Sequence, residues 1–232
     1  MALTFVQSDH NDVAGGSSVA ITFDSTPTAG NLIVVCAGID GADPGTTAVA
    51  DNKGNTYTRD VIDTQGGART AIYWAKDIAT SATHTVTFTP GGASFAYITA
   101  YEFSGGDTST QPDTTAGTGG ATGTSISSGT SGTTTIADCV AMSTIGTDQG
   151  NTDTINPEAG YTTPGAGKGE NENGAGFYAN SSAYKVLTGT GTEECTWTLG
   201  GSHTASACIS VFRGTAGAAA VRAKRLLLLG VA

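Results

Sequence analysis

The chain has 232 residues and a formal net charge of −10, and only 13% of its residues are charged, about half the usual share. Glycine accounts for 34 residues, about twice its usual share. The acidic balance excludes nucleic acid as the main partner, because phosphates require a basic surface. No run reaches the ~18 apolar residues that a membrane span requires.

Short runs of β-branched and aromatic residues alternate with Gly, Asn, Asp and Pro turns along the chain, the pattern of an antiparallel sandwich or barrel. In 84–89, Val86 and Phe88 alternate with threonines, so one face is apolar and the other polar. No stretch keeps a helical apolar period over three turns. The sequence predicts an all-β protein with strands at 18–24, 31–39, 69–76, 84–89, 95–104, 133–144, 176–187, 193–199 and 204–213.

The chain also contains an internal repeat. A shift of 109 residues places Lys76 on Lys185, Val86 on Cys195, Phe88 on Trp197, Phe103 on Phe212 and Gly105 on Gly214. Further upstream the shift is 107, which places 29–36 on 136–143 with only apolar character and strand phase in common. We therefore define two pseudo-repeats, 18–105 and 133–214.

One such half alone would leave an apolar face open, so the halves are predicted to pack on each other. The prediction is one two-sheet antiparallel β-sandwich of jelly-roll type over 1–214, with two independent domains as the alternative. The Gly/Thr/Ser-rich segment 106–132 is a flexible linker or a surface crossover with irregular strands. The acidic loop 146–175 is long enough to favour a partner contact.

Several motifs resemble a known module. They are AGNLIVV at 29–35, DNKGNTYT at 51–58, IYWAKDI at 72–78, TVTF at 85–88 and EFSG at 102–105. Together they resemble a β-sandwich module of bacterial surface proteins and of phage or prophage structural proteins, which is similar to concanavalin-like jelly rolls. The resemblance covers most of 18–105 and reaches the second half only through the repeat. It implies a sandwich fold without one fixed function.

Two acidic positions are candidate sites. Asp51 and Asn55 offer oxygen ligands for calcium, but the loop between them lacks the spacing of a calcium loop, and a Lys-Gly turn explains it without a metal. Glu102 lies between Tyr101 and Phe103, where burial could raise its pKa for acid catalysis. Glycosidase chemistry needs a second carboxylate, and no E-x-D-x-x-E run exists, so we interpret Glu102 as structural.

The remaining catalytic and metal patterns are also missing from the sequence. His10, His84 and His203 have no metal-ligand spacing, and no G-x-S-x-G elbow occurs. The four cysteines form no CxxC pair and are predicted to be reduced and buried. A bridge between Cys195 and Cys208, across a hairpin closed near 200–202, is the alternative. No metal or other cofactor is predicted.

Aromatic residues offer a sugar-stacking platform as a further alternative. Tyr73 and Trp74 are adjacent in a strand, so one should point into the core and one out. The full set of candidates for a glycan site is Tyr73, Trp74, Tyr161, Phe177 and Tyr178.

The C-terminal segment 215–232 is predicted to be an attachment tail. A spacer of small residues is followed by three basic residues and four leucines, and the closing VRAKRLLLLGVA resembles the ends of small phage structural proteins. A final strand of the sandwich is the alternative. The predicted partner-binding residues are Arg222, Lys224, Arg225, Leu226, Leu227, Leu228 and Leu229.

These observations predict a non-enzymatic virion structural protein, above all a phage capsid decoration protein. The N-terminus lacks a secretory signal although the composition is that of an extracellular protein. A virion surface protein made in the host cytoplasm reconciles the two. Its partners would be other virion proteins of capsid or tail and copies of itself in a homo-oligomer. A carbohydrate-binding adhesin module of a phage tail or bacterial surface is the alternative, and a glycan hydrolase ranks third.

Overall fold

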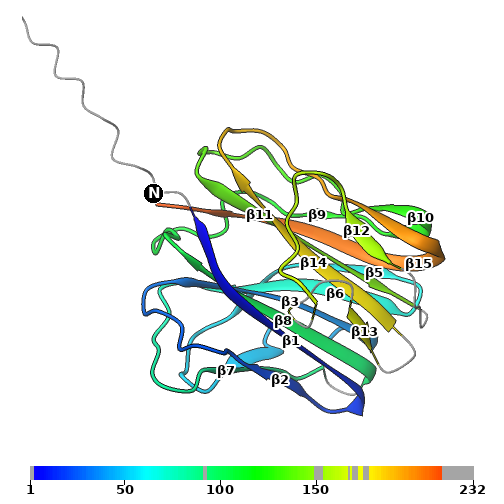
Figure 1. Ribbon diagram of the computed structural model, residues 1–232, viewed down its shortest axis with the longest axis horizontal. Coiled ribbons are helices and arrows are strands. Elements are labelled where there is room, and N and C mark those ends of the chain that lie inside the picture. The colour runs from blue at the N-terminus through cyan, green and yellow to red at the C-terminus, as the bar shows by residue number, and fades with distance from the viewer. Residues whose placement is uncertain are drawn as a thin grey trace, which may run out of the picture.

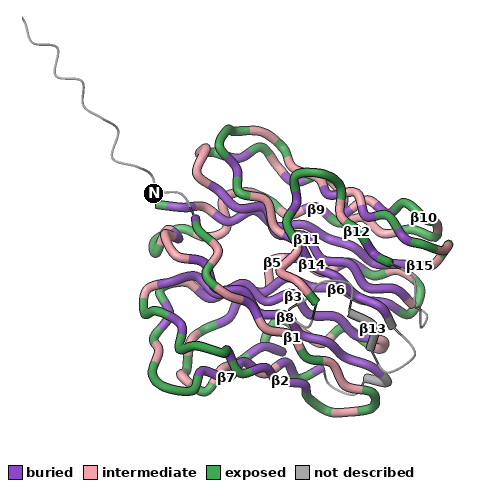
Figure 2. Tube along the Cα trace, in the orientation of Figure 1, coloured by how far each residue is buried: buried purple, intermediate pink, exposed green. Residues whose placement is uncertain are grey.

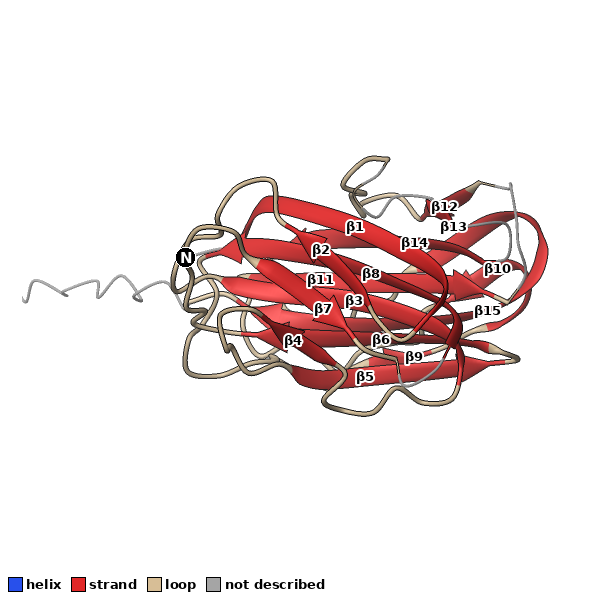
Figure 3. Ribbon diagram, turned by 90° about the horizontal axis from the view of Figure 1, so that it is seen from below, coloured by secondary structure: helices blue, strands red, loops and turns tan. Residues whose placement is uncertain are grey.

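A computed structural model describes residues 3–90, 93–148, 154–166, 168, 172–174 and 178–215. This part of the chain is built from antiparallel strands and turns (Figure 3), which confirms the all-β class. It contains no helix that could cross a membrane. The strands are β1 (Thr4–Gly16), β2 (Val19–Thr22), β3 (Leu32–Gly41), β4 (Val49–Asp51), β5 (Thr58–Gln65), β6 (Ala68–Ala75), β7 (Thr85–Phe88), β8 (Ala93–Ser104), β9 (Gly117–Thr118), β10 (Ala121–Ser127), β11 (Cys139–Thr147), β12 (Ile155–Pro157), β13 (Glu172–Gly174), β14 (Tyr178–Leu187) and β15 (Thr196–Arg213).

The strands form three stacked sheets rather than the two that the sequence predicted (Figure 1). The central sheet has the order β1-β8-β3-β6-β5, and the small sheet has the order β2-β7-β4. The large sheet has the order β10-β15-β11-β14-β13, with β9 and β12 also paired to β15. Strands β1 to β8 make up the first half of the molecule and β9 to β15 the second. The third sheet arises because the short strands β2, β4 and β7 pair only with one another.

The central sheet is buried on both faces, which explains the continuous apolar run of β3. Ile33 and Val35 face the small sheet and pack with Phe88 of β7. Val34 and Cys36, the alternate residues, face the large sheet. Strands covered on both sides read as unbroken apolar runs rather than alternating ones, and Figure 2 shows β3 and β8 buried along nearly their whole length.

The large sheet follows the same rule. All residues of β11 are buried, with Ala141 and Ile145 packed in a cluster with Trp197. Val140 and Met142 point the other way, toward the central sheet.

The central and large sheets meet in an apolar cluster that we call the seam. Both halves contribute to it, and Tyr101 of β8 bonds Ser182 of β14 across it with 2.6 Å between the hydroxyl oxygens. Burying Phe103 and Phe212 here contributes roughly 1.5–3 kcal/mol for each side chain. The buried members of the seam are Leu3, Leu32, Val34, Cys36, Val61, Ile72, Tyr101, Phe103, Val140, Met142, Cys208 and Phe212.

The two halves have similar strand orders. Phe88, aligned with Trp197 by the 109-residue shift, pairs with Val19 on one side and Val49 on the other. Trp197 pairs in the same way with Ile126 and Pro157. The upstream shift of 107 is wrong in phase, because it places residues of the small-sheet face of β3 on residues of the seam face of β11.

Several strand limits differ from the sequence prediction for physical reasons. The expected hairpin at 200–202 does not exist: β15 runs through these residues as one strand of 18 residues. Gly200 and Gly201 lie inside it, where glycine permits a bend. Strands β1 and β5 were not predicted because they are polar edge strands of the central sheet. The predicted strand 133–144 begins only at Cys139.

The segment 106–132 is an anchored crossover rather than a flexible linker. Its β9 and β10 pair with β15, and the residues that follow β10 form a hydroxyl ladder with 191–195. The amide of Ser128 donates to the carbonyl of Cys195, whose own amide donates to Ser128 Oγ. Ser131 makes the same exchange with Glu193, and Thr134 makes it with Gly191. Hydroxyls therefore replace the backbone carbonyls of a regular ladder.

Candidate functional site

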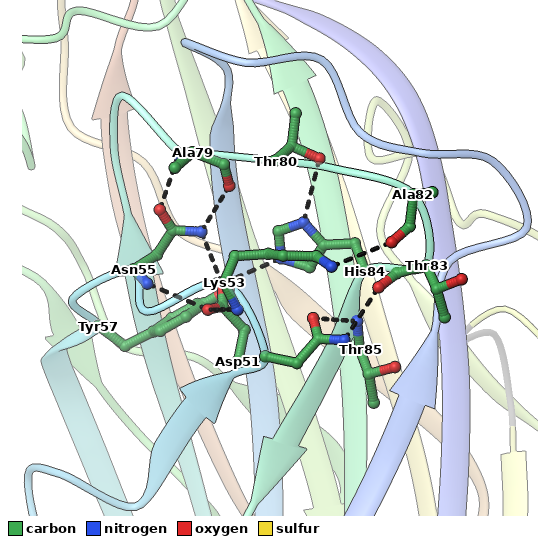
Figure 4. A network of polar contacts seen from close by, with 11 residues as sticks. Asp51, Lys53, Asn55, Tyr57, Ala79, Thr80, Ala82, Thr83, His84 and Thr85 are labelled. Carbon is green, nitrogen blue, oxygen red and sulfur yellow. Dashed lines mark hydrogen bonds and ion pairs between the residues drawn. The ribbon is translucent and has the colours of Figure 1, made fainter.

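The motif at 51–58 forms a polar cluster with the loop that precedes β7, with a buried centre and an exposed rim (Figure 4). Strand β4 ends at Asp51, and the chain turns at Gly54, whose φ of 78° favours glycine. The turn brings Asp51, Asn52, Lys53 and Asn55 against residues 79–85. We call this cluster the clamp.

Asp51 is the centre of the clamp. Its carboxylate accepts hydrogen bonds from the amides of Lys53 (2.9 Å) and Asn55 (3.0 Å) and from the Asn55 side chain (2.7 Å). It also accepts from the Tyr57 hydroxyl (3.1 Å) and lies 2.9 Å from His84 Nε2. The Asp51 and His84 side chains have no exposed surface. Burial acts to raise the pKa of Asp51, but the hydrogen bonds outweigh it and the pKa is lowered.

The other side chains of the clamp bind the backbone of the facing loop. Asn52 exchanges two bonds with Thr85 and donates a third to the Thr83 carbonyl. Asn55 exchanges two bonds with Ala79, and Lys53 Nζ donates to the Ala82 carbonyl at 3.0 Å. These bonds hold Thr83 at a φ of 60°, which is strained for a β-branched residue. The clamp thus fixes an otherwise unfavourable loop over β7.

The geometry bears on the calcium alternative at Asp51 and Asn55. Both carboxylate oxygens of Asp51 already accept N–H or O–H donors, and a cation would have to displace them. Among the described residues no three His, Cys, Asp or Glu side chains gather as metal ligands do. The site fits hydrogen-bond donors rather than a metal ion.

A hydroxyl, an imidazole and a carboxylate lie next to one another in that order, from Thr80, His84 and Asp51. That order activates a nucleophile in many hydrolases. Here the Thr80 Oγ1 to His84 Nδ1 distance is 3.5 Å, the outer limit of a hydrogen bond. The imidazole is fully buried against the edge of Phe23. The geometry supports a structural role for His84, which no sequence spacing indicated.

Glu102 is buried among neutral donors, as the structural interpretation expected. Its carboxylate accepts hydrogen bonds from the side-chain amides of Gln7 (2.7 Å) and Asn31 (2.5 Å) and from the backbone amide of Thr28 (2.7 Å). Gln7 continues the network by exchanging bonds with Ser25. The carboxylate ties β1, β8 and the loop before β3 together.

The second half has a shallow surface pocket where the first half has its clamp. Lys185 Nζ and Glu193 form an ion pair at 2.7 Å, and the same amine lies 5.6 Å from the centre of the Tyr161 ring. The pocket is lined by Lys185, Val186, Leu187, Thr188, Gly189, Thr190 and Glu193.

The predicted aromatic platform is not assembled by the described side chains. Tyr73 is buried under the small sheet, and Tyr161 is only 9% exposed. Trp74 does not point to solvent but packs against the seam, because both faces of the central sheet are covered. The Phe177 and Tyr178 side chains lie outside the described residues.

All four cysteines are free and buried. Cys195 and Cys208 flank no hairpin: Cys208 lies within β15 and faces the seam, whereas Cys195 immediately precedes that strand and packs in the cluster around Trp197. Burial raises the pKa of Cys195 to about 12. The thiols therefore act as small apolar groups.

The predicted attachment residues, from Arg222 to Leu229, lie outside the described residues, as do 149–153, 167, 169–171 and 175 of the loop at 146–175. The fold and these clusters define an all-β protein of stacked antiparallel sheets whose loops are held by hydrogen-bonded polar side chains. No family model, curated protein or solved structure matches the chain. The resemblance to concanavalin-like sandwich modules and the jelly-roll type remain predictions.

Proposed function

We propose that the chain is a non-enzymatic virion structural protein that decorates a phage capsid. The observation that carries this proposal is how the polar groups at the two candidate sites are used. The side chains around Asp51 and Glu102, where the sequence offered metal binding or catalysis, bind the protein's own loops. They stiffen a β-sheet body, as a component exposed on a particle requires.

The edge of the central sheet offers further support. In β1 the amide of His10 donates to the Asp9 side chain, and the amide of Asp12 donates to the Asn11 side chain. Edge amides occupied in this way are poor templates for an added strand. A protein crowded on a particle benefits from such protection against uncontrolled sheet growth.

Attachment is proposed to occur through the tail rather than the sandwich. All 20 acidic residues and seven of the ten basic ones precede residue 216, so the body carries a charge of −13 and the tail +3. The basic residues Arg222, Lys224 and Arg225 suit an acidic neighbour, including the body of another copy. Leu226 to Leu229 would supply apolar contacts.

Immunogold electron microscopy of particles from cells that carry the gene tests this proposal. Antibody raised against 1–214 should label the shells of purified particles. Label confined to the soluble fraction, with bare shells and tails, would contradict a virion role. Label on tails alone would favour the alternative function, a carbohydrate-binding adhesin module of a phage tail.

A glycan-binding adhesin module is the second candidate, favoured by the pocket at 185–193. Its polar lining, with Thr188, Thr190 and Glu193, offers donors and acceptors for sugar hydroxyls beside Tyr161. A glycan array with the intact chain and Glu193→Gln separates the two functions. Binding that the substitution abolishes would favour the adhesin, and an array without binding would leave the decoration role as the proposal.

A further inference from the structure

The seam carries two acidic side chains that the proposed function does not use. A bulge in β5 lies between Arg59 and Val61, so Asp60 is the extra residue in the ladder. Asp63 lies two positions past Val61, which packs in the seam. The Asp63 residue is only 8% exposed. Asp63 Oδ2 accepts the amide of Ala207 in β15 at 3.1 Å. A carboxyl group of the first half thus completes a backbone hydrogen bond of the second.

Near this bond the seam leaves polar atoms unsatisfied. Asp60 Oδ2 and Ser210 Oγ are both buried and make no well-formed hydrogen bond among the described residues, although the Ser210 hydroxyl lies close enough to the Asp60 carboxyl to oppose the rise of its pKa. Ser210 has no exposed surface. An unsatisfied buried polar atom is costly and an unpaired buried charge more so. A protonated carboxyl group lowers this cost because it is neutral and gains a donor.

No cation in the described residues pairs with either carboxylate. Arg59, on the same strand, pairs with Asp43, and Arg69 of β6 donates to the Gly67 carbonyl. The facing titratable group of β15 is the buried Cys208 thiol, whereas β9 has none. Asp148, after β11, adds another carboxylate near the turn at Gly66.

We propose that Asp60 and Asp63 make the seam a pH-responsive joint, which holds the two halves more tightly when these groups are protonated than when they are ionised. Burial raises the pKa of both carboxyl groups, and that of Asp63 reaches about 6. A carboxyl group whose pKa is higher in the folded state stabilises the fold by protonation. For Asp63 this stabilisation is complete below the unfolded value of 3.8 and is lost as the pH rises through about 6.

The test compares Asp63→Asn with the wild-type chain in urea unfolding at pH 5.0 and 7.5. The asparagine oxygen can still accept the Ala207 amide but cannot ionise. We expect the ratio of the unfolding constants, wild type over variant, to be about tenfold higher at pH 7.5 than at pH 5.0. Other titrating groups, including His10, cancel in this ratio. A ratio that changes less than about twofold would overturn the proposal.

Asp43→Asn is the matched control. Asp43 is largely exposed, and its bond to Arg59 lowers its pKa, so it stays ionised at both pH values and its ratio should not change. Hydrogen exchange of the Ala207 amide, corrected for the intrinsic rate, reports the joint directly in a His10→Gln chain, in which the opposite pH dependence of the His10 imidazole is absent. Its protection should be greater at pH 5.0 than at 7.5. If Asp63→Asn fails to fold, equal protection at the two pH values is by itself enough to reject the joint.

Discussion

The two halves solve the same local problem with different chemistry. In the first half, the loop before β7 is held by carboxylate and carboxamide side chains of the clamp, centred on Asp51. In the second half, the equivalent stretch before Trp197 is held by the hydroxyls of Ser128, Ser131 and Thr134. Both devices let side chains imitate backbone pairing where the strands are irregular. A clamp concentrates its bonds on one buried charge, whereas a ladder divides them among equivalent neutral groups.

The largest expected effect comes from separating the halves. A chain of residues 1–105 would expose the seam face of the central sheet, including Leu32, Tyr101 and Phe103. We expect it to be insoluble or to lack dispersed amide signals in NMR spectra, while the full chain unfolds in one cooperative urea transition. A soluble, well-dispersed 1–105 fragment would instead establish two independent domains.

The second largest effect on stability is expected from replacing Asp51, the centre of the clamp. Asp51→Ala leaves His84 and Tyr57 buried without their acceptor, and we expect a loss of about 3–5 kcal/mol in the free energy of unfolding. Urea denaturation measures this loss. Asp43→Ala, which removes a largely exposed carboxylate, should cost less than about 1 kcal/mol. Equal losses for the two variants would show that the clamp is not a stabilising unit.

One substitution in the ladder should cost less stability than Asp51→Ala, because the bonds of the ladder are divided among several hydroxyls. Ser131→Ala leaves the Glu193 amide without its acceptor, so we expect a loss of about 1–3 kcal/mol. The exposed Thr133 lies two residues away, and Thr133→Ala should change stability by less than about 0.5 kcal/mol. If Ser131→Ala proves as costly as Asp51→Ala, the contrast between clamp and ladder is wrong.

His10 of β1 gives the first half a pH dependence of its own. Burial lowers its pKa to about 4 from an ordinary value of 6.5, so the folded state keeps the imidazole neutral. Its stabilisation is present above about pH 6.5 and is lost as the pH falls toward 4. Between pH 7.5 and 5.0 we expect a loss of about 2 kcal/mol that His10→Gln removes. Urea denaturation of both chains at the two pH values measures it, and an identical pH dependence would exclude this role.

The smallest effect on stability is expected from truncation after Thr215. This variant keeps one residue more than the predicted sandwich, which ended at 214, because the Thr215 amide donates to the Gly105 carbonyl at 2.9 Å. The truncated chain should melt within about 2 °C of the full chain and fail to attach to particles. Early melting or aggregation would place the tail in the core instead.

The sequence predicted elements whose apolar pattern was strong and missed those defined by their surroundings. The alternation around Val86 and Phe88 was sufficient to predict β7 and its buried face. The clamp was missed because its partners, Asp51 and His84, are far apart in the chain and have no motif spacing. The ladder does have a signal in the sequence, the Ser-Gly-Thr pattern repeated every three residues at 128–133. The acidic pair at the seam could not be predicted, since a bulge decides where Asp60 lies.

Strand β15 has a consequence for the order in which the protein can be built. Four other strands, β9, β10, β11 and β12, pair with it, although it is the last described strand to be synthesised. Pairings between distant segments fold slowly and leave intermediates prone to aggregation. The large sheet therefore cannot close before β15 has been synthesised, and until then the seam face of the central sheet is uncovered. Translation products that stop before β15 cannot reach the native state and are excluded from any assembly that the protein joins.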